Sequence, residues 1–376
     1  MKQRLALRVL AELLQWSDET AQAELAWLKL MSRLKYDSYQ GFLAGVRFIE
    51  SLVVWLEQLE PQHRQAAYSL VRKQLVFVST LEMRRLVERF YPRQVEPELV
   101  RAAAAVKSIP PYMVWANPEA AALVARLRRQ TLFIGLSDGA RMDLLRRANT
   151  GVILNEQTVL APMIDKDKWI DLGDELAKDL PPGEGQSKPR FTCVYLIDDL
   201  TASGTTLVRY DEQKQKWKGK LKKFREHIVQ ARQELGNAFP LDENFVLRVH
   251  HYIATETAVE SVKTLCSQAA AHFSASWWFP KVEFSEGMVL GSSATLASGD
   301  PFEELAKQYY DTHLENEHSA ESGKKEMHFG YKDGRLTVIL EHNTPNNSLS
   351  LLWAETPGGA TGHRMRPLFR RRSRHV

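Results

Sequence analysis

One segment constrains the fold of this chain more than any other. Residues 194–206 are Val-Tyr-Leu-Ile-Asp-Asp-Leu-Thr-Ala-Ser-Gly-Thr-Thr, so a largely apolar run is followed by two acids and a small, hydroxyl-rich turn. An apolar run of this kind is typical of a strand buried in a parallel sheet. Open α/β sheets bind their ligands at the carboxyl ends of the strands, which is where the two acids would stand. The segment therefore predicts an α/β fold with a binding site after this strand.

The residues that follow the strand suit a sugar phosphate. Asp198 and Asp199 could accept hydrogen bonds from two vicinal ribose hydroxyls. The hydroxyl-rich turn comprises Thr201, Ala202, Ser203, Gly204, Thr205 and Thr206. We expect it to lead into a helix whose first N–H groups bind a phosphate. The alternative is an ordinary strand followed by a helix N-cap, because Asp-Asp and Ser/Thr-Gly pairs are common at such places.

In its order of apolar residues, acids, hydroxyls and glycine, this segment resembles the ribose-phosphate signature of type I phosphoribosyltransferases. It departs from that signature at two positions: the family usually has an aliphatic residue where Thr201 stands, and Thr or Ser where Ala202 stands. The resemblance implies a parallel sheet flanked by helices. It also implies that Asp198 and Asp199 hold the ribose and stabilise positive charge on its ring, while residues 201–206 hold the 5-phosphate.

A second loop fits the same resemblance. Residues 131–136 are predicted to form a strand and residues 142–147 a helix, with a polar loop between them. In a phosphoribosyltransferase-like sheet this loop approaches the diphosphate of the sugar donor. The corresponding residues here are Ser137, Asp138, Gly139 and Arg141. Gly139 permits close backbone approach and Arg141 could neutralise phosphate charge, although a plain left-handed turn at Asp-Gly explains the pattern too.

The resemblance also implies a reaction. The donor would be 5-phosphoribosyl 1-diphosphate or a related ribosyl phosphate, and Mg²⁺ would bridge its diphosphate oxygens with few ligands from the protein. A Mg-dependent pentosyltransferase is one expectation. A protein that keeps the fold as a non-catalytic nucleotide sensor is the other, because a fold does not establish catalysis.

The carboxyl-terminal part narrows the resemblance. A polar cluster at residues 341–348, Trp353 and an arginine-rich end make the chain similar to the PRTase-CE proteins, which are predicted effectors or sensors of bacterial conflict systems. This resemblance implies a role in anti-phage defence, with a protein partner from such a system. The polar cluster itself could hydrogen-bond a base, or it could form a rigid Asn/Pro turn.

The chain is predicted to have three parts. Residues 1–112 form a helical amino-terminal region, residues 113–300 the α/β core, and residues 301–376 an extension that completes the core and ends in a basic tail. Helical spacing of apolar residues predicts that Trp16, Trp27 and Trp55 lie in the core of the first part. Residues 74–79 could be a short strand, or Ser79 could begin a helix as part of a capping box.

The net charge of +4 is small, but basic residues are concentrated in two places. One runs from Lys214 to Lys223 and includes Trp217; the other runs from Arg364 to Arg374. Both could bind nucleic acid, with Trp217 stacking on a base, which would make the chain an interaction subunit. A solvated helix face is the alternative for the first run.

Other classes of protein are disfavoured. Two cysteines are too few for a disulfide framework, and the adjacent His250 and His251 would point to opposite faces of a strand, so no zinc site is expected. The amino terminus lacks the apolar core of a signal peptide, and no stretch reaches ~20 uninterrupted apolar residues. We therefore expect a cytoplasmic protein without a membrane span.

Overall fold

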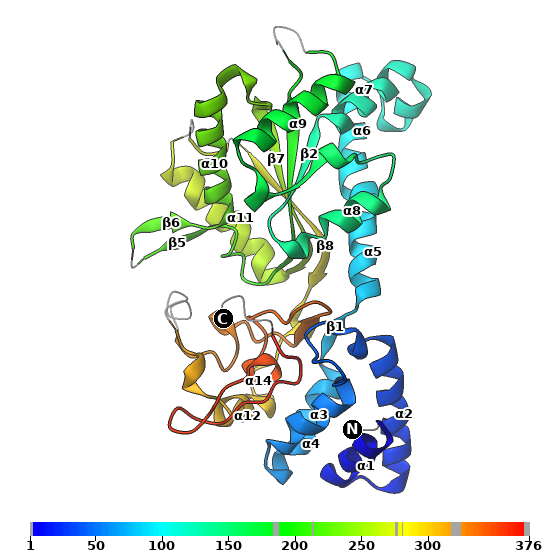
Figure 1. The fold of residues 1–376 in the computed structure, drawn as a ribbon, viewed down its shortest axis with the longest axis vertical. Coiled ribbons are helices and arrows are strands. Elements are labelled where there is room, and N and C mark those ends of the chain that lie inside the picture. Colours follow the sequence, from blue (N-terminus) through cyan, green and yellow to red (C-terminus); the bar gives the residue numbers. More distant parts are fainter. Residues whose placement is uncertain are drawn as a thin grey trace. The chain divides into compact units, whose positions relative to one another are not determined.

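The computed structural model describes residues 3–182, 188–212, 214–274, 277–279, 281–316 and 325–371. The chain forms two compact units (Figure 1). Arg84–Val289 make up the first, called here the sheet unit. The second, called the discontinuous unit, combines Met1–Met83 with Leu290–Val376. A compact unit is not necessarily a segment that folds by itself. The three domains predicted with boundaries after residues 112 and 300 therefore stay a prediction.

The sheet unit is built on five strands in the order β3-β2-β4-β7-β8. Their bounds are β2 (Thr131–Gly135), β3 (Thr158–Leu160), β4 (Phe191–Thr201), β7 (Leu241–Thr255) and β8 (Val282–Leu290). The pairs β2–β3, β2–β4 and β4–β7 are parallel, with Ile197 opposite both Gly135 and His250. The predicted class, a parallel sheet flanked by helices with a helical amino-terminal region, is confirmed.

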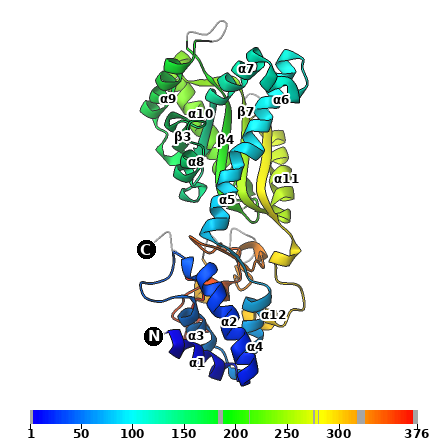
Figure 2. The same cartoon turned by 90° about the vertical axis from the view of Figure 1, so that its right-hand side faces the viewer.

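Helices cover both faces of this sheet. Their bounds are α5 (Thr80–Phe90), α6 (Glu96–Lys107), α7 (Pro118–Arg129), α8 (Met142–Ala148), α9 (Lys166–Asp179), α10 (Lys220–Leu235) and α11 (Glu256–His272). Leu132 and Leu196 pack in one core with Trp169 of α9 and Phe224 of α10. The intervening strand residues point to the opposite face of the sheet. Helices α5 and α6 cross that second face (Figure 2). This alternation follows from the period of two along a strand.

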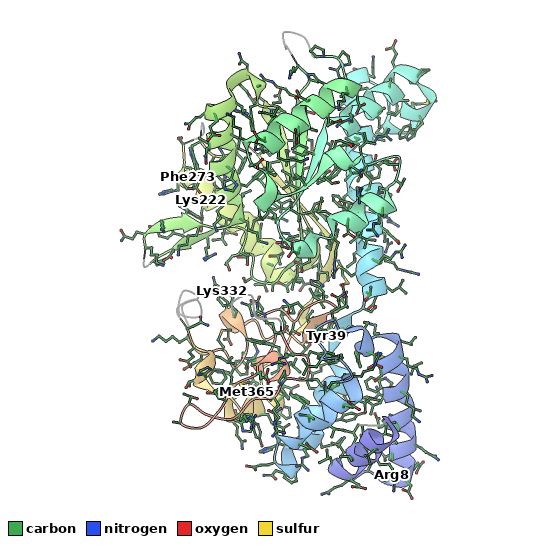
Figure 3. All side chains as sticks on the ribbon, in the orientation of Figure 1. Arg8, Tyr39, Lys222, Phe273, Lys332 and Met365 are labelled. Atoms are coloured by element: carbon green, nitrogen blue, oxygen red, sulfur yellow. The ribbon has the colours of Figure 1, made fainter. Side chains whose placement is uncertain are left out.

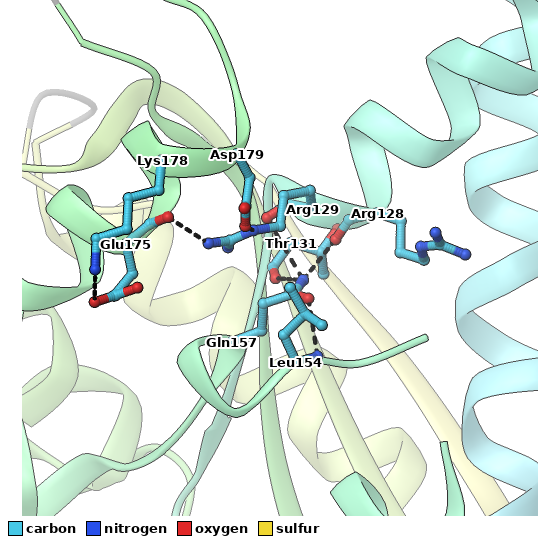
Figure 4. A network of polar contacts seen from close by, with 8 residues as sticks. All are labelled: Arg128, Arg129, Thr131, Leu154, Gln157, Glu175, Lys178 and Asp179. Atoms are coloured by element: carbon cyan, nitrogen blue, oxygen red, sulfur yellow. Dashed lines mark hydrogen bonds and ion pairs between the residues drawn. The ribbon is translucent and has the colours of Figure 1, made fainter. Parts of the chain in front are cut away.

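A polar network anchors the amino end of β2 (Figure 4). Arg129, at the end of α7, is buried and donates to Asp179 of α9 at 2.6 Å and to the carbonyl of Glu175 at 2.9 Å. The amide of Gln157 donates to the carbonyls of Arg128 and Thr131 at 2.7 and 2.8 Å. These bonds hold α7, α9 and the segment before β3 around the start of β2, at the end of the strand opposite the loop that begins at Ser137.

A hairpin corrects one expectation about the hydroxyl-rich turn. After Thr206 the chain does not enter a helix directly but forms the antiparallel strands β5 (Arg209–Asp211) and β6 (Lys216–Lys218), and α10 begins only at Lys220. Trp217 stabilises this hairpin because its ring is buried against Tyr210 and Phe273.

The discontinuous unit joins the two ends of the chain in one apolar core. Its elements are α1 (Gln3–Leu13), α2 (Asp18–Leu34), α3 (Phe48–Glu57), α4 (Pro61–Lys73), β1 (Val76–Val78), α12 (Phe302–Gln308), β9 (Val338–Leu340) and α14 (Ser350–Trp353). Strand β1 pairs in parallel with β9, so that Phe77 lies opposite Ile339. Two short strands that are far apart in the sequence thus pair within one unit.

Aromatic side chains fill the centre of this core. Tyr39, labelled in Figure 3, donates its hydroxyl hydrogen to the carbonyl of Arg370 at 2.7 Å, and its ring meets Phe369 edge-on with 5.2 Å between ring centroids. Trp55 is fully buried and donates to the carbonyl of Leu351 at 2.7 Å. Trp16 and Trp27 are partly buried against the same core. The predicted core position is confirmed for Trp55, whereas Trp16 and Trp27 lie at the edge of this core.

The two alternatives for residues 74–82 both occur. Val76–Val78 form β1, and directly afterwards the backbone N–H of Ser79 donates to the carboxylate of Glu82 at 2.9 Å, while the N–H of Glu82 donates to the Ser79 hydroxyl at 3.4 Å. This reciprocal pair is a capping box at the start of α5.

Among the residues that the structure describes, no helix combines the length and apolar character needed to cross a bilayer.

Candidate functional site

The carboxyl end of β4 carries a buried acid with an internal counter-charge. The side chain of Asp198 is 7% exposed, and its Oδ1 accepts a hydrogen bond from the hydroxyl of Ser137 at 2.5 Å. Its Oδ2 pairs with the ammonium of Lys220, the first residue of α10. The end of β4, the loop after β2 and the start of α10 are thereby held together. Lys220 lies inside the basic run but was not predicted to belong to the site.

Asp199 faces the backbone of the loop after β2. A Cβ atom added to Gly139 would lie 2.4 Å from Oδ2 of Asp199. Any residue other than glycine would therefore force this carboxylate to move. Its other oxygen, Oδ1, accepts from the N–H of Leu200 at 2.8 Å. Asp199 is more exposed than Asp198. The sequence prediction that Gly139 permits a close approach is consistent with this geometry, although the group that approaches it is a side chain of the protein.

The hydroxyl-rich turn is fixed by the end of β7 and the start of α11. The hydroxyl of Thr255 donates to the carbonyl of Ala202 at 2.7 Å and accepts from the N–H of Ala258 at 3.0 Å. Gly204 has φ of +75°, and a Cβ there would lie 2.8 Å from the Val262 side chain. Glycine is needed for both reasons. The turn therefore has one backbone path, set by α11 behind it.

The other predicted residues of the two loops are distributed as follows. Asp138 and Thr206 are exposed, Thr201 and Thr205 are buried, and Ser203 and Thr205 share a hydrogen bond of 2.9 Å between their hydroxyls. Arg141 is half-buried, and its backbone has the left-handed conformation, with φ of +52°. The left-handed turn expected at Asp-Gly thus falls two residues after Gly139. Thr206 is the hydroxyl of this turn that solvent reaches best.

Strand β7 contributes residues that the sequence did not indicate. His251 lies opposite Asp198 in the parallel ladder and is buried. Burial lowers the pKa of His251, and Lys220 acts in the same direction while Asp198 and Asp199 oppose it, so the imidazole is neutral near pH 7. Tyr252 donates to the carbonyl of Ala140 at 3.1 Å, and burial raises its pKa. The one sequence feature that could have indicated these two residues was their position near the carboxyl end of a strand beside β4.

The donor atoms suit a magnesium ion that arrives with its ligand. In the described residues no group of three or more His, Cys, Asp or Glu side chains could hold a metal ion. Asp198 already accepts from Lys220 and Ser137, which leaves the carboxylate of Asp199 as the more accessible hard donor. Mg²⁺ keeps several waters or phosphate oxygens and needs few protein ligands. These residues therefore fit an ion coordinated mainly by a diphosphate.

The basic run is less available than its composition suggests. Lys218 pairs with Asp211, Lys220 with Asp198 and Lys222 with Glu226. The ring of Trp217 is buried, so the prediction that it stacks on a base is wrong. Nucleic-acid binding through the other lysines stays a prediction.

Of the arginine-rich end, residues 372–374 lie outside the described residues, whereas Arg364, Arg366 and Arg370 are exposed.

The polar cluster at residues 341–348 is largely used within the fold. The Ser348 hydroxyl donates to the carbonyl of Val338 at 2.6 Å, and the Asn347 amide donates to the carbonyl of Tyr331 at 2.8 Å. The Thr344 hydroxyl lies 2.9 Å from that of Tyr39. These contacts favour the rigid turn over recognition of a base.

The parallel sheet, with acids at the end of β4 facing a glycine loop after β2, is consistent with a phosphoribosyltransferase-like protein. A family model described as PRTase-CE matches residues 52–371, so the chain belongs to the PRTase-CE family. The match includes residues of both compact units. The resemblance inferred from the acidic turn and the polar carboxyl-terminal cluster is thus confirmed. No curated protein and no solved structure matches the chain.

Proposed function

We propose that the chain binds a ribosyl 5-phosphate carrying a 1-diphosphate at the carboxyl end of β4. The observation that carries the proposal is the convergence of Asp198 and Asp199 with the loop after β2 at Gly139. In this assignment Asp199 accepts hydrogen bonds from the ribose hydroxyls, and Asp198 orients the site through Ser137 and Lys220. The 5-phosphate lies against residues 202–206, where Thr206 offers an exposed hydroxyl.

The chemistry proposed is transfer of the ribosyl group from diphosphate to an acceptor. Breaking the bond from C1 to the diphosphate develops positive charge on the ribose ring, which the carboxylate of Asp199 stabilises. In this proposal the guanidinium of Arg141, in the loop after β2, would neutralise charge on the leaving diphosphate. Bound Mg²⁺ would neutralise charge on the leaving group. The acceptor supplies the nucleophile.

A second function, non-catalytic sensing of a nucleotide, is favoured by one specific observation. The Asp198 carboxylate is paired with Lys220, and Ala202 has no side-chain hydroxyl, while its carbonyl already accepts from Thr255. A site with these groups satisfied can hold a ligand without driving its cleavage. Either activity would serve an effector or sensor of an anti-phage defence system, the role that we propose from membership of the family.

Calorimetric titration with 5-phosphoribosyl 1-diphosphate and Mg²⁺ tests the proposal, followed by mass spectrometry for diphosphate release with nucleobases as acceptors. We expect saturable binding, and an affinity at least roughly tenfold weaker in Asp199→Asn because a charge-assisted hydrogen bond is lost. Asp171→Asn is the matched control, since Asp171 is exposed on α9.

Each outcome of this experiment has a defined meaning. Binding with diphosphate release supports a transferase, and binding without it supports the sensor. If the wild-type chain fails to bind, or Asp199→Asn binds as well as Asp171→Asn does, the ligand assignment is wrong.

A further inference from the structure

A small pocket lies on the face of the sheet that α5 crosses. Its volume is about 210 Å³, and its walls include Arg89, Phe90, Arg93 and Gln94, with His250 of β7 and Gly287 of β8. Successive strand residues alternate between faces, so His250 lies on the opposite face from His251, which neighbours Asp198. The pocket is therefore separate from the turn that follows β4.

Two arginines stand together in this pocket without an acid between them. Arg89 lies in the last turn of α5, and Arg93 lies four residues later in a π-helical turn, Tyr91–Val95, which contains Pro92. In the part of the chain that the structure describes, neither has an ion-pair partner, whereas Arg84 of the same helix pairs with Glu88. Like charges at this spacing destabilise a helix, which an anion between them would offset. Two guanidinium groups suit the oxygens of a phosphate or sulfate.

Beneath the arginines lies a histidine with an unmet hydrogen bond. His250 is fully buried, its Nδ1 is 2.9 Å from the hydroxyl of Ser285, and its ring packs on Phe90 with 4.3 Å between centroids. Its Nε2 is buried and has no hydrogen-bond partner among the described residues. Burial lowers the pKa of His250 to about 3, so the ring is neutral and Nε2 either donates or accepts, depending on the tautomer.

We propose that this pocket is a second ligand site, which takes a small tetrahedral oxyanion of the phosphate class. Arg89 and Arg93 bind its oxygens at the mouth, Gln94 offers an amide, and a small rotation of His250 brings Nε2 to its inner side. Hydrogen phosphate carries both acceptor oxygens and a hydroxyl, so it satisfies either tautomer. The volume is below the roughly 300–1,000 Å³ of sites for larger ligands, which limits the occupant to a phosphate with at most a short substituent.

A larger cavity nearby does not offer the same chemistry. It has a volume of about 600 Å³ and is lined by Arg248, but that guanidinium is 2.8 Å from Glu283 and 3.2 Å from Glu98. Its charge is compensated twice over. Among the arginines that line these two cavities in the described residues, only Arg89 and Arg93 have no ion-pair partner, and only the small pocket holds two guanidinium groups.

The test uses the full chain, labelled with ¹⁵N in its histidine rings, and titrates it with inorganic phosphate at constant ionic strength. We expect the resonances of His250, assigned with His250→Gln, to shift in a saturable manner. In Arg89→Gln combined with Arg93→Gln, the affinity should fall at least roughly tenfold, because both charge-assisted contacts are removed. Arg85→Gln is the matched control, since Arg85 is exposed one turn earlier on α5.

The same titration separates this site from the one after β4. Asp199→Asn should leave the phosphate-induced shift of His250 unchanged, so this proposal and the proposed function can fail independently. The second site is refuted if phosphate leaves the His250 resonances of the wild type unshifted. It is also refuted if the double arginine variant keeps the affinity of Arg85→Gln, or if the shift disappears in Asp199→Asn.

Discussion

At the scale of single residues, the ion pair between Asp198 and Lys220 stabilises the folded state in addition to placing charge in the candidate site. Asp198 is almost completely buried, and its two carboxylate oxygens accept from Lys220 and Ser137. Removing the cation would leave a buried carboxylate without its counter-charge, which costs more than the pair itself is worth.

We expect Lys220→Gln to lower the free energy of unfolding by about 2 kcal/mol, less than for a fully buried pair because the Lys220 side chain is 26% exposed. Chemical denaturation of the variant measures this loss. Adding Asp198→Asn should restore most of it, since the two amides no longer leave a charge unpaired. A double variant less stable than Lys220→Gln would contradict this account.

Gly139→Ala tests the packing of the loop against Asp199. The new methyl group would have to displace the Asp199 carboxylate, which lies 2.4 Å from its position. Because that carboxylate is the proposed ribose acceptor, we expect affinity for 5-phosphoribosyl 1-diphosphate to fall at least roughly tenfold. Calorimetry measures the affinity, and thermal denaturation of the ligand-free variant checks that the fold persists. Unchanged affinity would show that Asp199 does not need this position.

At the scale of elements, Asp311 organises the turn at the end of the discontinuous unit. It is fully buried, and it accepts from the backbone N–H of His313 at 2.9 Å and of Gly358 at 3.1 Å. Burial by itself would raise the pKa of Asp311. Hydrogen bonds from Thr356, Thr361 and the two N–H groups outweigh burial and lower the pKa to about 2.

We expect Asp311→Asn to destabilise the protein by about 2 kcal/mol at pH 7, because the amide accepts these bonds more weakly than the carboxylate. A lowered pKa stabilises the fold where the group is charged, so the contribution is complete above about pH 4 and is lost as the pH falls toward 2. The difference between wild type and variant in denaturant titrations should therefore shrink over that interval. A difference that stays constant from pH 7 to pH 3 would rule out the charge as its source.

Local elements were predictable where one pattern dominated. The strands β2, β4 and β7 and helix α8 follow from apolar runs and the polar loops after them, and the acids after β4 follow from the rule that ligands bind at strand ends. The hairpin after Thr206 was missed because its lysines resemble a solvated helix face, whereas Trp217 packs on Phe273, a contact between residues far apart in sequence. Lys220 and His251 were missed for the same reason: register and tertiary contacts bring them to Asp198.

At the scale of the whole molecule, the two units differ in how they use the chain. The sheet unit is continuous, whereas the core of the discontinuous unit combines Phe48 and Trp55 with Leu351 and Phe369. A fragment of residues 80–290, which contains all five strands of the sheet, should therefore fold alone and keep the ligand site. Residues 1–83 alone lack about half of their core and should not form cooperative tertiary structure. Circular dichroism melts of the two fragments measure this, and a cooperative transition for residues 1–83 would contradict it.

The parallel pairing of β1 with β9 has a consequence for biosynthesis. Helices α1 to α4 are synthesised before the sheet unit, yet Phe77 meets Ile339, and Tyr36 and Phe48 meet Phe369, only after residues 339 and 369 have left the ribosome. The sheet unit can fold during translation, while the apolar faces of α1 to α4 stay exposed until the segment up to residue 369 has been made. A prematurely terminated chain would display those faces to proteases and chaperones. Folding of the discontinuous unit is thus delayed until its second segment is available, whereas the sheet unit does not wait for that segment.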